Sequence, residues 1–161
     1  DDNWGNVRKL PDLTEKPRKG GYGMYYHFDY VGAPRNSKWI NISPIPRIWE
    51  QMHLAYEYGI RQLWIVNVGD LKPMEYPITF FLDMAWNPDQ FQANNLQEHT
   101  ETFCREQFGT AYAKEAARIL SLYPKYNRRV TPEMLSMQTY SFNYGEWERV
   151  VNEYNLSLIH I

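Results

Sequence analysis

The sequence predicts a mixed α/β protein, with a parallel strand–helix–strand unit in residues 1–90 and a helical bundle in residues 91–161. Two strand-like runs lie in the first part, which is rich in Gly, Pro, Trp and Tyr, and a helical pattern separates them. From residue 91 onward, Glu, Gln, Arg and Ala predominate and apolar residues recur at helical spacing. These observations place the sheet before the bundle.

The first predicted strand covers residues 22–30 and follows the turn signal Gly20-Gly21. Strand alternation divides its side chains between two faces. One face carries Met24, Tyr26, Phe28 and Tyr30, and the more polar face carries Tyr25, His27 and Asp29.

A helix is predicted to start at Ser43-Pro44 and to end at Gly59. The uninterrupted apolar run 63–66 follows, and it predicts a parallel strand buried on both faces. The next apolar run, 78–82, fits either a strand or a helix.

Caps and periodicity predict the helices of the second half. One helix stops at Gly109, and the next ends before Pro124. Cys104 lies on an apolar stripe and is predicted to be a core thiol. Helix starts are predicted at Asn87-Pro88, at Asn95 with Glu98 as a capping box, at Thr110 and at Thr131-Pro132, and Trp147, Val150, Val151 and Tyr154 form the stripe of the last helix.

Composition excludes several classes of protein. The formal net charge is −2, from 17 Lys and Arg against 19 Asp and Glu, which argues against a nucleic-acid binder. No apolar run is long enough for a transmembrane helix, so no membrane partner is expected. The four His residues lie far apart and there is one Cys, so no metal site is predicted. Aromatic residues make up 16% of the chain, which suits sugar stacking as well as ordinary packing.

Both ends indicate a fragment of a longer protein. The chain opens on the polar cluster Asp1-Asp2-Asn3-Trp4, which is no signal peptide. Its tail, residues 156–161, ends without a cap and resembles translated adapter sequence, so we treat these last six or so residues as candidate non-native sequence.

Three polar groups are candidates for chemistry. The segment Asp1–Asn6 suits acid catalysis if a strand precedes it, or it is a solvated acidic loop. The segment His27–Tyr30, with Arg35 in the next loop, suits ligand binding or proton transfer, or it is a satisfied internal pair beside a surface loop. The segment Asn67–Asp70 suits reading a sugar hydroxyl, or it is a backbone turn.

Several segments together, in order and spacing, resemble glycoside hydrolase family 115, the xylan α-1,2-glucuronidases. They cover about residues 1–90, and the helical remainder fits the later domain of that family. The segments are DDNWGNVR at 1–8, GGYGMYYHFDYVG at 20–32, PR at 34–35, WIN at 39–41, WEQM at 49–52 and LWIVNVGDLKP at 63–73.

The resemblance implies part of a (β/α)₈ TIM-type barrel in residues 1–90, followed by the α-helical bundle. It implies a hydrolase that removes (4-O-methyl)-glucuronic acid side groups from glucuronoxylan or its oligosaccharides with inversion and without an organic cofactor. It also implies an extracellular or periplasmic location. A homodimer through the helical region is a further expectation.

Site residues follow from the resemblance. The predicted catalytic residues are Asp1, Asp2 and Asp29, of which one of the first two is the general acid. His27 and Asn67 are expected to bind sugar hydroxyls or position water, Arg35 to bind the uronate carboxylate, and Trp4 or Trp39 to stack on a sugar. The predicted substrate-binding residues are Trp4, His27, Tyr30, Arg35, Trp39, Asn67 and Asp70.

Because a (β/α)₈ barrel needs about 200 residues or more, the chain alone is expected to be inactive and to expose apolar barrel surface. Two other readings remain open: a non-catalytic carbohydrate-binding or scaffold module, and a helical protein-interaction fragment in residues 91–161.

Overall fold

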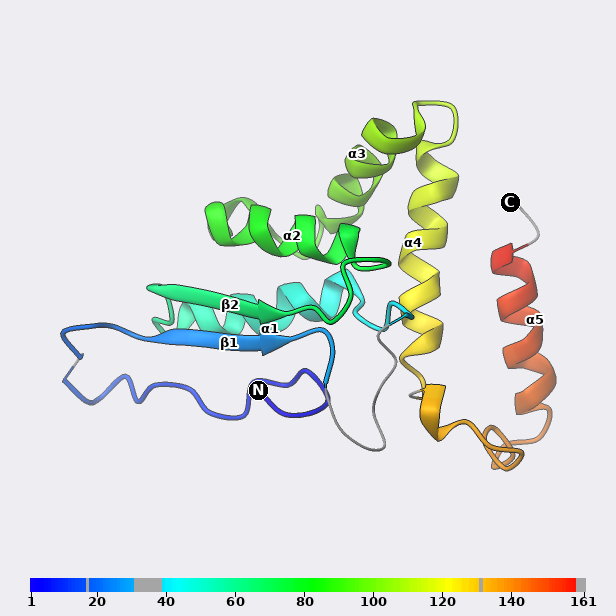
Figure 1. The fold of residues 1–161 in the computed structure, drawn as a ribbon, viewed down its shortest axis with the longest axis horizontal. Coiled ribbons are helices and arrows are strands. Elements are labelled where there is room, and N and C mark those ends of the chain that lie inside the picture. Colours follow the sequence, from blue (N-terminus) through cyan, green and yellow to red (C-terminus); the bar gives the residue numbers. More distant parts are fainter. Residues whose placement is uncertain (17, 31–38, 131, 159–161) are drawn as a thin grey trace.

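The computed structural model describes residues 1–16, 18–30, 39–130 and 132–158. Within these ranges, two strands, five α-helices and two short 3-10 turns follow one another (Figure 1). They are β1 (Gly23–His27), α1 (Ile45–Glu57), β2 (Leu63–Asn67), α2 (Glu75–Trp86), η1 (Pro88–Gln90), α3 (Leu96–Phe108), α4 (Ala113–Asn127), η2 (Pro132–Met134) and α5 (Glu146–Leu158).

The predicted parallel unit is confirmed. β1 and β2 pair in parallel, with Gly23 opposite Leu63 and His27 opposite Asn67. The connection through α1 brings the carboxyl ends of both strands to the same edge of the sheet. Side chains that follow the two strands can therefore lie close together.

One hydrophobic core lies between the sheet and the helices. Met24, Tyr26 and Phe28, from one face of the first strand and just beyond it, are at most 8% exposed and pack against α1 and α2. The core continues past residue 90, because Phe91 and Leu96 belong to it. Full burial of such side chains contributes about 1.5–3 kcal/mol each, so this face fixes the orientation of the strands.

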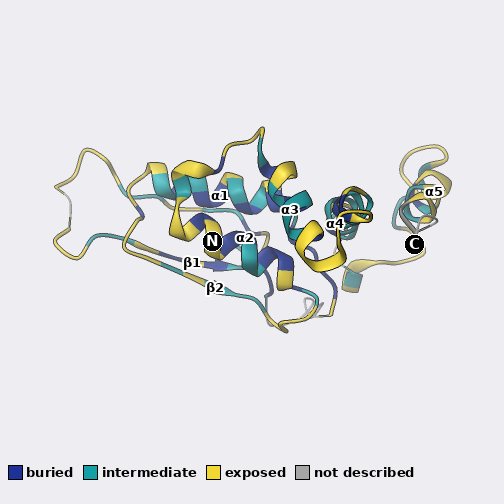
Figure 2. Ribbon diagram, turned by 90° about the horizontal axis from the view of Figure 1, so that it is seen from above, coloured by how far each residue is buried: buried dark blue, intermediate teal, exposed yellow. Residues whose placement is uncertain are grey.

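The opposite face of the sheet is open. Figure 2 shows α1 and α2 on one side of the two strands. Tyr25, Leu63 and Ile65 lie on the other side and are 53%, 56% and 48% exposed. The prediction that residues 63–66 are buried on both faces is therefore wrong for this chain, because helices cover only one face.

The ambiguous run 78–82 is helical and lies within α2. Phe80 and Phe81 are fully buried while Leu82 is 58% exposed, so the run fills the core from one side of a helix. The prediction that the helix after Gly109 ends before Pro124 is wrong, because this helix, α4, continues to Asn127. Pro124 is completely buried there, and its packing offsets the missing hydrogen bond.

The predicted helix starts at Asn87-Pro88 and at Asn95 have different outcomes. Asn87-Pro88 begins only the turn η1, because the indole of Trp49 donates to the carbonyl of Phe91 at 3.0 Å and holds Phe91 extended. The predicted helix start at Asn95 is confirmed, because Asn95 is the N-cap of α3, but its side chain forms no capping hydrogen bond. Its side-chain oxygen accepts from the Gln92 amide instead, at 2.9 Å.

The three other predicted helix starts also differ from the structure. The helix predicted from Ser43-Pro44 begins at Ile45, and the Ser43 hydroxyl donates to the carbonyl of Phe28 at 3.4 Å. The helix predicted from Thr110 begins at Ala113. Pro132 begins only the turn η2, and Thr131 lies outside the described residues.

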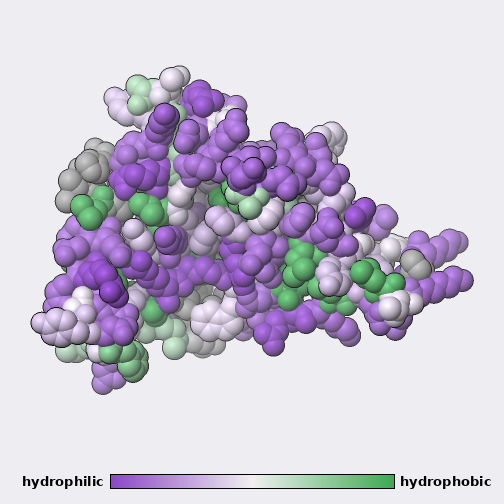
Figure 3. Space-filling view, turned by 180° about the vertical axis from the view of Figure 1, so that it is seen from behind, coloured by the Kyte–Doolittle hydropathy of each residue, from purple (hydrophilic) through white to green (hydrophobic). Residues whose placement is uncertain are grey.

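The helical part joins the sheet through α3 and α4, which pack against each other, while α5 contacts α4 (Figure 1). Cys104 is completely buried between α3 and α4, as predicted. No helix among the described residues is long and apolar enough to span a membrane. Seen from behind in Figure 3, hydrophilic side chains predominate and hydrophobic ones form small separate groups.

Candidate functional site

The Asp1 carboxylate lies at the carboxyl end of β1 and accepts three hydrogen bonds. Its Oδ1 is 2.8 Å from Nδ1 of His27, and its Oδ2 accepts from the His27 amide at 2.9 Å and from the Tyr30 hydroxyl at 2.8 Å. The side chain is only 2% exposed, although the residue as a whole is exposed. These three contacts hold the Asp1 carboxylate in one position against His27 and Tyr30.

The His27 ring is held in one orientation. It stacks on Tyr30 at 5.0 Å between ring centroids and lies 4.4 Å from the ring of Tyr25. Burial lowers the pKa of His27, and the positive charge of the amino group of Asp1 acts in the same direction, whereas the Asp29 carboxylate acts to raise it. The neutral ring with its proton on Nδ1 already satisfies Asp1, so Nε2 is left as an acceptor. Nε2 forms no hydrogen bond to any residue that the structure describes.

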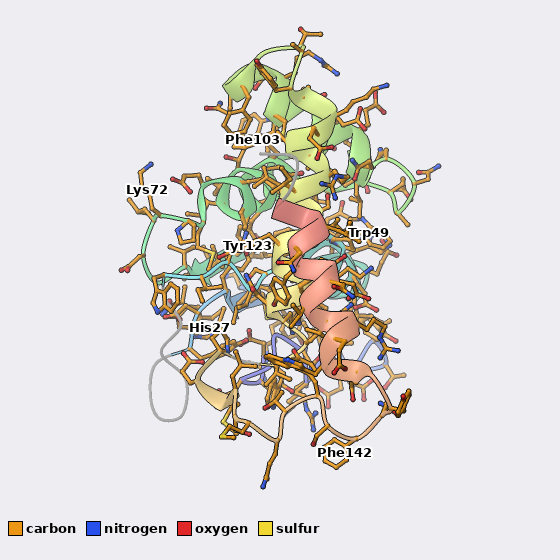
Figure 4. All side chains as sticks on the ribbon, turned by 90° about the vertical axis from the view of Figure 1, so that its right-hand side faces the viewer. His27, Trp49, Lys72, Phe103, Tyr123 and Phe142 are labelled. Atoms are coloured by element: carbon orange, nitrogen blue, oxygen red, sulfur yellow. The ribbon has the colours of Figure 1, made fainter. Side chains whose placement is uncertain are left out.

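Tyr30 completes this cluster of Asp1, His27 and Tyr30, which we call the acid–histidine cluster. Burial raises the pKa of the Tyr30 hydroxyl, so it stays protonated and donates to Asp1. Figure 4 views the molecule from the side toward which the strands end, and it labels His27 there. The cluster therefore presents one fixed acceptor, Nε2, at the sheet edge.

Asp2 has a different environment from its neighbour. It accepts from the amides of Trp4 and Asn6 at 2.8 and 2.9 Å, from the Asn6 side chain, and from Arg8 at 3.4 Å. Partial burial acts to raise the pKa of Asp2, but the hydrogen bonds from Asn6 and Trp4 and the Arg8 charge hold it below its usual value. Asp2 thus organises the loop of residues 2–8.

The end of β2 lies beside the end of β1. The Asn67 carbonyl accepts from the amide of Phe28 at 2.8 Å, and its side-chain oxygen accepts from the amide of Gly69 at 3.1 Å. Asp29 is 3% exposed and packs on Gly69, whose φ is +68°. A Cβ atom at Gly69 would lie 2.9 Å from the Asp29 carboxyl group, so only glycine fits this approach.

The other predicted site residues are more dispersed. Trp4 and Trp39 are 56% and 70% exposed, and Asp70 is exposed on the loop after β2. Arg35 lies outside the described residues. The structure thus brings Asp1, His27 and Tyr30 into direct contact, with Asn67 at the end of the neighbouring strand β2 and Asp29 just beyond the end of β1.

Arg128 is a residue at this site that the sequence analysis did not single out. It follows α4 and donates to the carbonyl oxygens of Trp4 and Ile42, the latter at 3.3 Å. No local pattern marks it, because its role depends on a contact across 124 sequence positions.

The cavity that lies next to Tyr30 of the cluster is small. The cavity between Trp4, Tyr30 and Arg128 has a volume of about 20 Å³, far below the roughly 300–1,000 Å³ typical of small-molecule sites. A hollow of about 760 Å³ lies between α1, α3 and α4, but none of the predicted site residues lines it. Within the described residues, no group of three His, Cys, Asp or Glu could hold a metal ion.

Comparisons with known proteins identify the family of the chain. The family model Glycosyl hydrolase family 115 matches residues 1–134. A similar solved structure is that of BtGH115A, a "novel family GH115 4-O-Methyl-alpha-glucuronidase" with "specificity for decorated arabinogalactans". The two chains are 30% identical with a TM-score of 0.70, and the match covers 98% of this chain and 23% of that one. No curated protein matches the chain.

Proposed function

The chain belongs to glycosyl hydrolase family 115, and from this premise we propose that it forms one wall of the active site of an α-glucuronidase. The observation that carries the proposal is the acid–histidine cluster at the carboxyl ends of two parallel strands, where α/β folds place their functional residues. The intact enzyme would release (4-O-methyl)-glucuronic acid side groups from a decorated polysaccharide. Glucuronoxylan is the substrate we expect, and BtGH115A makes decorated arabinogalactan the second candidate.

The open sheet face supports a barrel in the intact protein. In a (β/α)₈ barrel, helices cover the outside and side chains of the other face fill the interior. Here α1 and α2 cover one face, and Tyr25, Leu63 and Ile65 remain exposed on the other. We assign this open face to the barrel interior, which the rest of the protein would complete.

The acid–histidine cluster has the geometry for a proton-accepting role. Asp1 fixes the Nδ1–H tautomer of His27, so Nε2 can accept a proton from a water or a sugar hydroxyl. The Tyr30 hydroxyl and the amide of His27 both donate to Asp1 and hold it in place. In this proposal Asp1 acts through His27, and His27 faces the substrate.

An inverting reaction needs a carboxylic acid and a base about 6.5–9.5 Å apart. Asp2 is a poor proton donor because its lowered pKa keeps it ionised. Asp29, which is 3% exposed and packs against Gly69, stays our candidate for the second carboxyl group. A replacement of Asp29 therefore decides whether this chain supplies both groups.

Substrate binding falls to the residues around the cluster. Asn67 and Asp70 would read sugar hydroxyls from the loop after β2, and the exposed indoles of Trp4 and Trp39 offer stacking faces. We keep Arg35 as the candidate partner of the uronate carboxylate. A polymeric substrate fits an extracellular or periplasmic enzyme, and the helical region remains our candidate for a homodimer contact.

The test uses the full-length enzyme and measures glucuronic acid released from glucuronoxylan and from decorated arabinogalactan. Replacing Asp1 by Asn should lower kcat about 10³-fold or more, because the His27 tautomer is lost. Asp12→Asn is the matched control, since Asp12 is exposed and its carboxylate accepts hydrogen bonds only from Thr14 among the described residues. Proton NMR of the first product formed would reveal inversion.

Release of glucuronic acid that is unchanged in Asp1→Asn would contradict the assignment of the cluster. Full activity of Asp29→Asn would indicate that a part of the enzyme outside this chain supplies the second carboxyl group. A wild-type enzyme that binds the polysaccharide without any release would favour the non-catalytic carbohydrate-binding module.

A further inference from the structure

We propose that Arg128 is a positioning residue, through which the helical region sets the geometry of the Asp1 loop. The inference rests on the proposed function, because it concerns the same acid–histidine cluster. It extends that function by giving the helices after the sheet a role in catalysis.

The first support is the pair of carbonyl oxygens that Arg128 joins. Its Nη2 donates to the carbonyl of Trp4, and its Nη1 donates to the carbonyl of Ile42 at 3.3 Å. Trp4 belongs to the loop that carries Asp1, and Ile42 belongs to the segment between β1 and α1. One rigid guanidinium from the end of α4 therefore connects both segments that flank the cluster.

The same loop is fixed from its other side by β1. The Tyr26 hydroxyl, which is buried, donates to the carbonyl of Gly5 at 2.9 Å. Gly5 has a φ of +70°, and a Cβ atom there would lie 3.0 Å from the Tyr26 oxygen and 3.5 Å from Arg128 Nη2. The backbone at residues 4–5 is thus clamped between the sheet and α4.

The contacts of Arg128 and Tyr26 with the backbone at residues 4–5 begin only three residues from Asp1. The hydrogen bonds of Asp1 tolerate little displacement. The Asp1 oxygens lie 2.8–2.9 Å from their three partners on His27 and Tyr30. A further bond, from the amide of Asp2 to the carbonyl of Asn6 at 2.9 Å, makes the loop move as one unit. Loss of the Arg128 contacts would therefore displace Asp1 from His27.

Asn127 extends the connection to α5. Its side-chain nitrogen donates to the carbonyl of Asn41 at 3.3 Å, and its side-chain oxygen accepts from the hydroxyl of Tyr154 at 3.1 Å. Neighbouring residues at the end of α4 thus hold the segment before α1 at two successive carbonyls. The helical region reaches the site through these backbone contacts.

The test compares Arg128→Ala and Arg128→Lys with wild type in the full-length enzyme. Arg105→Met is the matched control, because Arg105 lies in the last turn of α3 and is exposed. We expect Arg128→Ala to lower kcat about 100-fold with KM within about two-fold, since a misplacement of about 1 Å costs that much. Added methylguanidinium should restore about ten-fold of the loss by donating to the two carbonyls. The kcat of Arg128→Lys should lie between those of Arg128→Ala and wild type, because one ammonium group cannot reproduce both hydrogen bonds of the guanidinium group.

Hydrogen exchange of the amides of residues 4–7 gives a second readout that does not need activity. We expect exchange at least about ten-fold faster in Arg128→Ala and unchanged in Arg105→Met. If wild type releases no glucuronic acid, the proposed function fails and exchange alone decides the inference. Unchanged exchange overturns it, as does an unchanged kcat in an active enzyme. A loss of kcat that methylguanidinium does not restore, with unchanged exchange, also overturns it.

Discussion

At the residue scale, two adjacent aspartates have opposite roles. Sequence reasoning could predict that Asp1 and Asp2 do not both point inward, because alternate side chains of an extended segment diverge. It could not predict which one contacts His27, since that depends on pairing across 26 positions. In the structure, Asp1 lies at the end of β1 and accepts a hydrogen bond from the His27 amide, whereas Asp2 accepts one from the Asn6 amide of its own loop.

The pH dependence of stability tests the assignment of Asp2. Because its pKa is below the ordinary 3.8 in the folded state, Asp2 stabilises the fold above that value. This contribution is lost as the pH falls through the lowered pKa. Asp2→Ala should cost about 1–2 kcal/mol near neutral pH, because two backbone amides lose their acceptor. Urea unfolding from about pH 7 to about pH 2 should show the difference from wild type shrinking in acid. A difference that is constant with pH would contradict this role.

At the element scale, the sequence predicts the sheet pairing but not all helix ends. The strand–helix–strand unit follows from local patterns, and it is confirmed by the pairing of β1 with β2. The run 78–82 stayed ambiguous because a short apolar run has no period of its own. The end of α4 was missed because burial of Pro124 outweighs its intrinsic tendency to break a helix.

The contact between the two strand-end loops depends on Gly69. Gly69→Ala should destabilise the chain by about 1–3 kcal/mol, because alanine would have to adopt a positive φ and would press on Asp29. Gly109→Ala is the matched control, since Gly109 also has a positive φ but has open space around its Cβ position. Equal losses in thermal unfolding of the two variants would show that the Asp29 contact contributes nothing.

The join between α2 and α3 depends on a buried hydroxyl pair. The Tyr76 hydroxyl donates to Thr100 at 2.6 Å and lies 3.3 Å from Nδ1 of His99. Tyr76→Phe should lower the free energy of unfolding by about 1 kcal/mol, while Tyr112→Phe, at an exposed tyrosine, should change it by less than about 0.5 kcal/mol. Denaturant unfolding measures both, and equal stability of Tyr76→Phe and wild type would contradict this account.

At the scale of the whole molecule, the chain spans 23% of the length of the similar protein BtGH115A, and its sheet has one uncovered face. The sequence predicts an exposed apolar surface because too few residues are present to close a barrel. It could not predict which side chains form that surface. The register of β1 against β2 determines which side chains these are, because it places Tyr25 beside Ile65.

The isolated chain should therefore bind a hydrophobic dye and self-associate, and it should release no glucuronic acid. Ile65→Lys should reduce dye fluorescence and association, because it places a charge in the centre of the open face. Leu82→Lys, at a leucine that is 58% exposed on α2, should change neither. Equal effects of the two replacements in light scattering and dye binding would show that the open face is not the surface that binds the dye and mediates self-association.

A double-mutant cycle of Asp1→Asn and His27→Ala in the full-length enzyme tests the central claim most directly. If Asp1 acts by orienting His27, each single replacement removes the same function. The double variant should then have a kcat within about three-fold of His27→Ala alone. Independent losses, in which the fold-reductions in kcat multiply, would contradict the account.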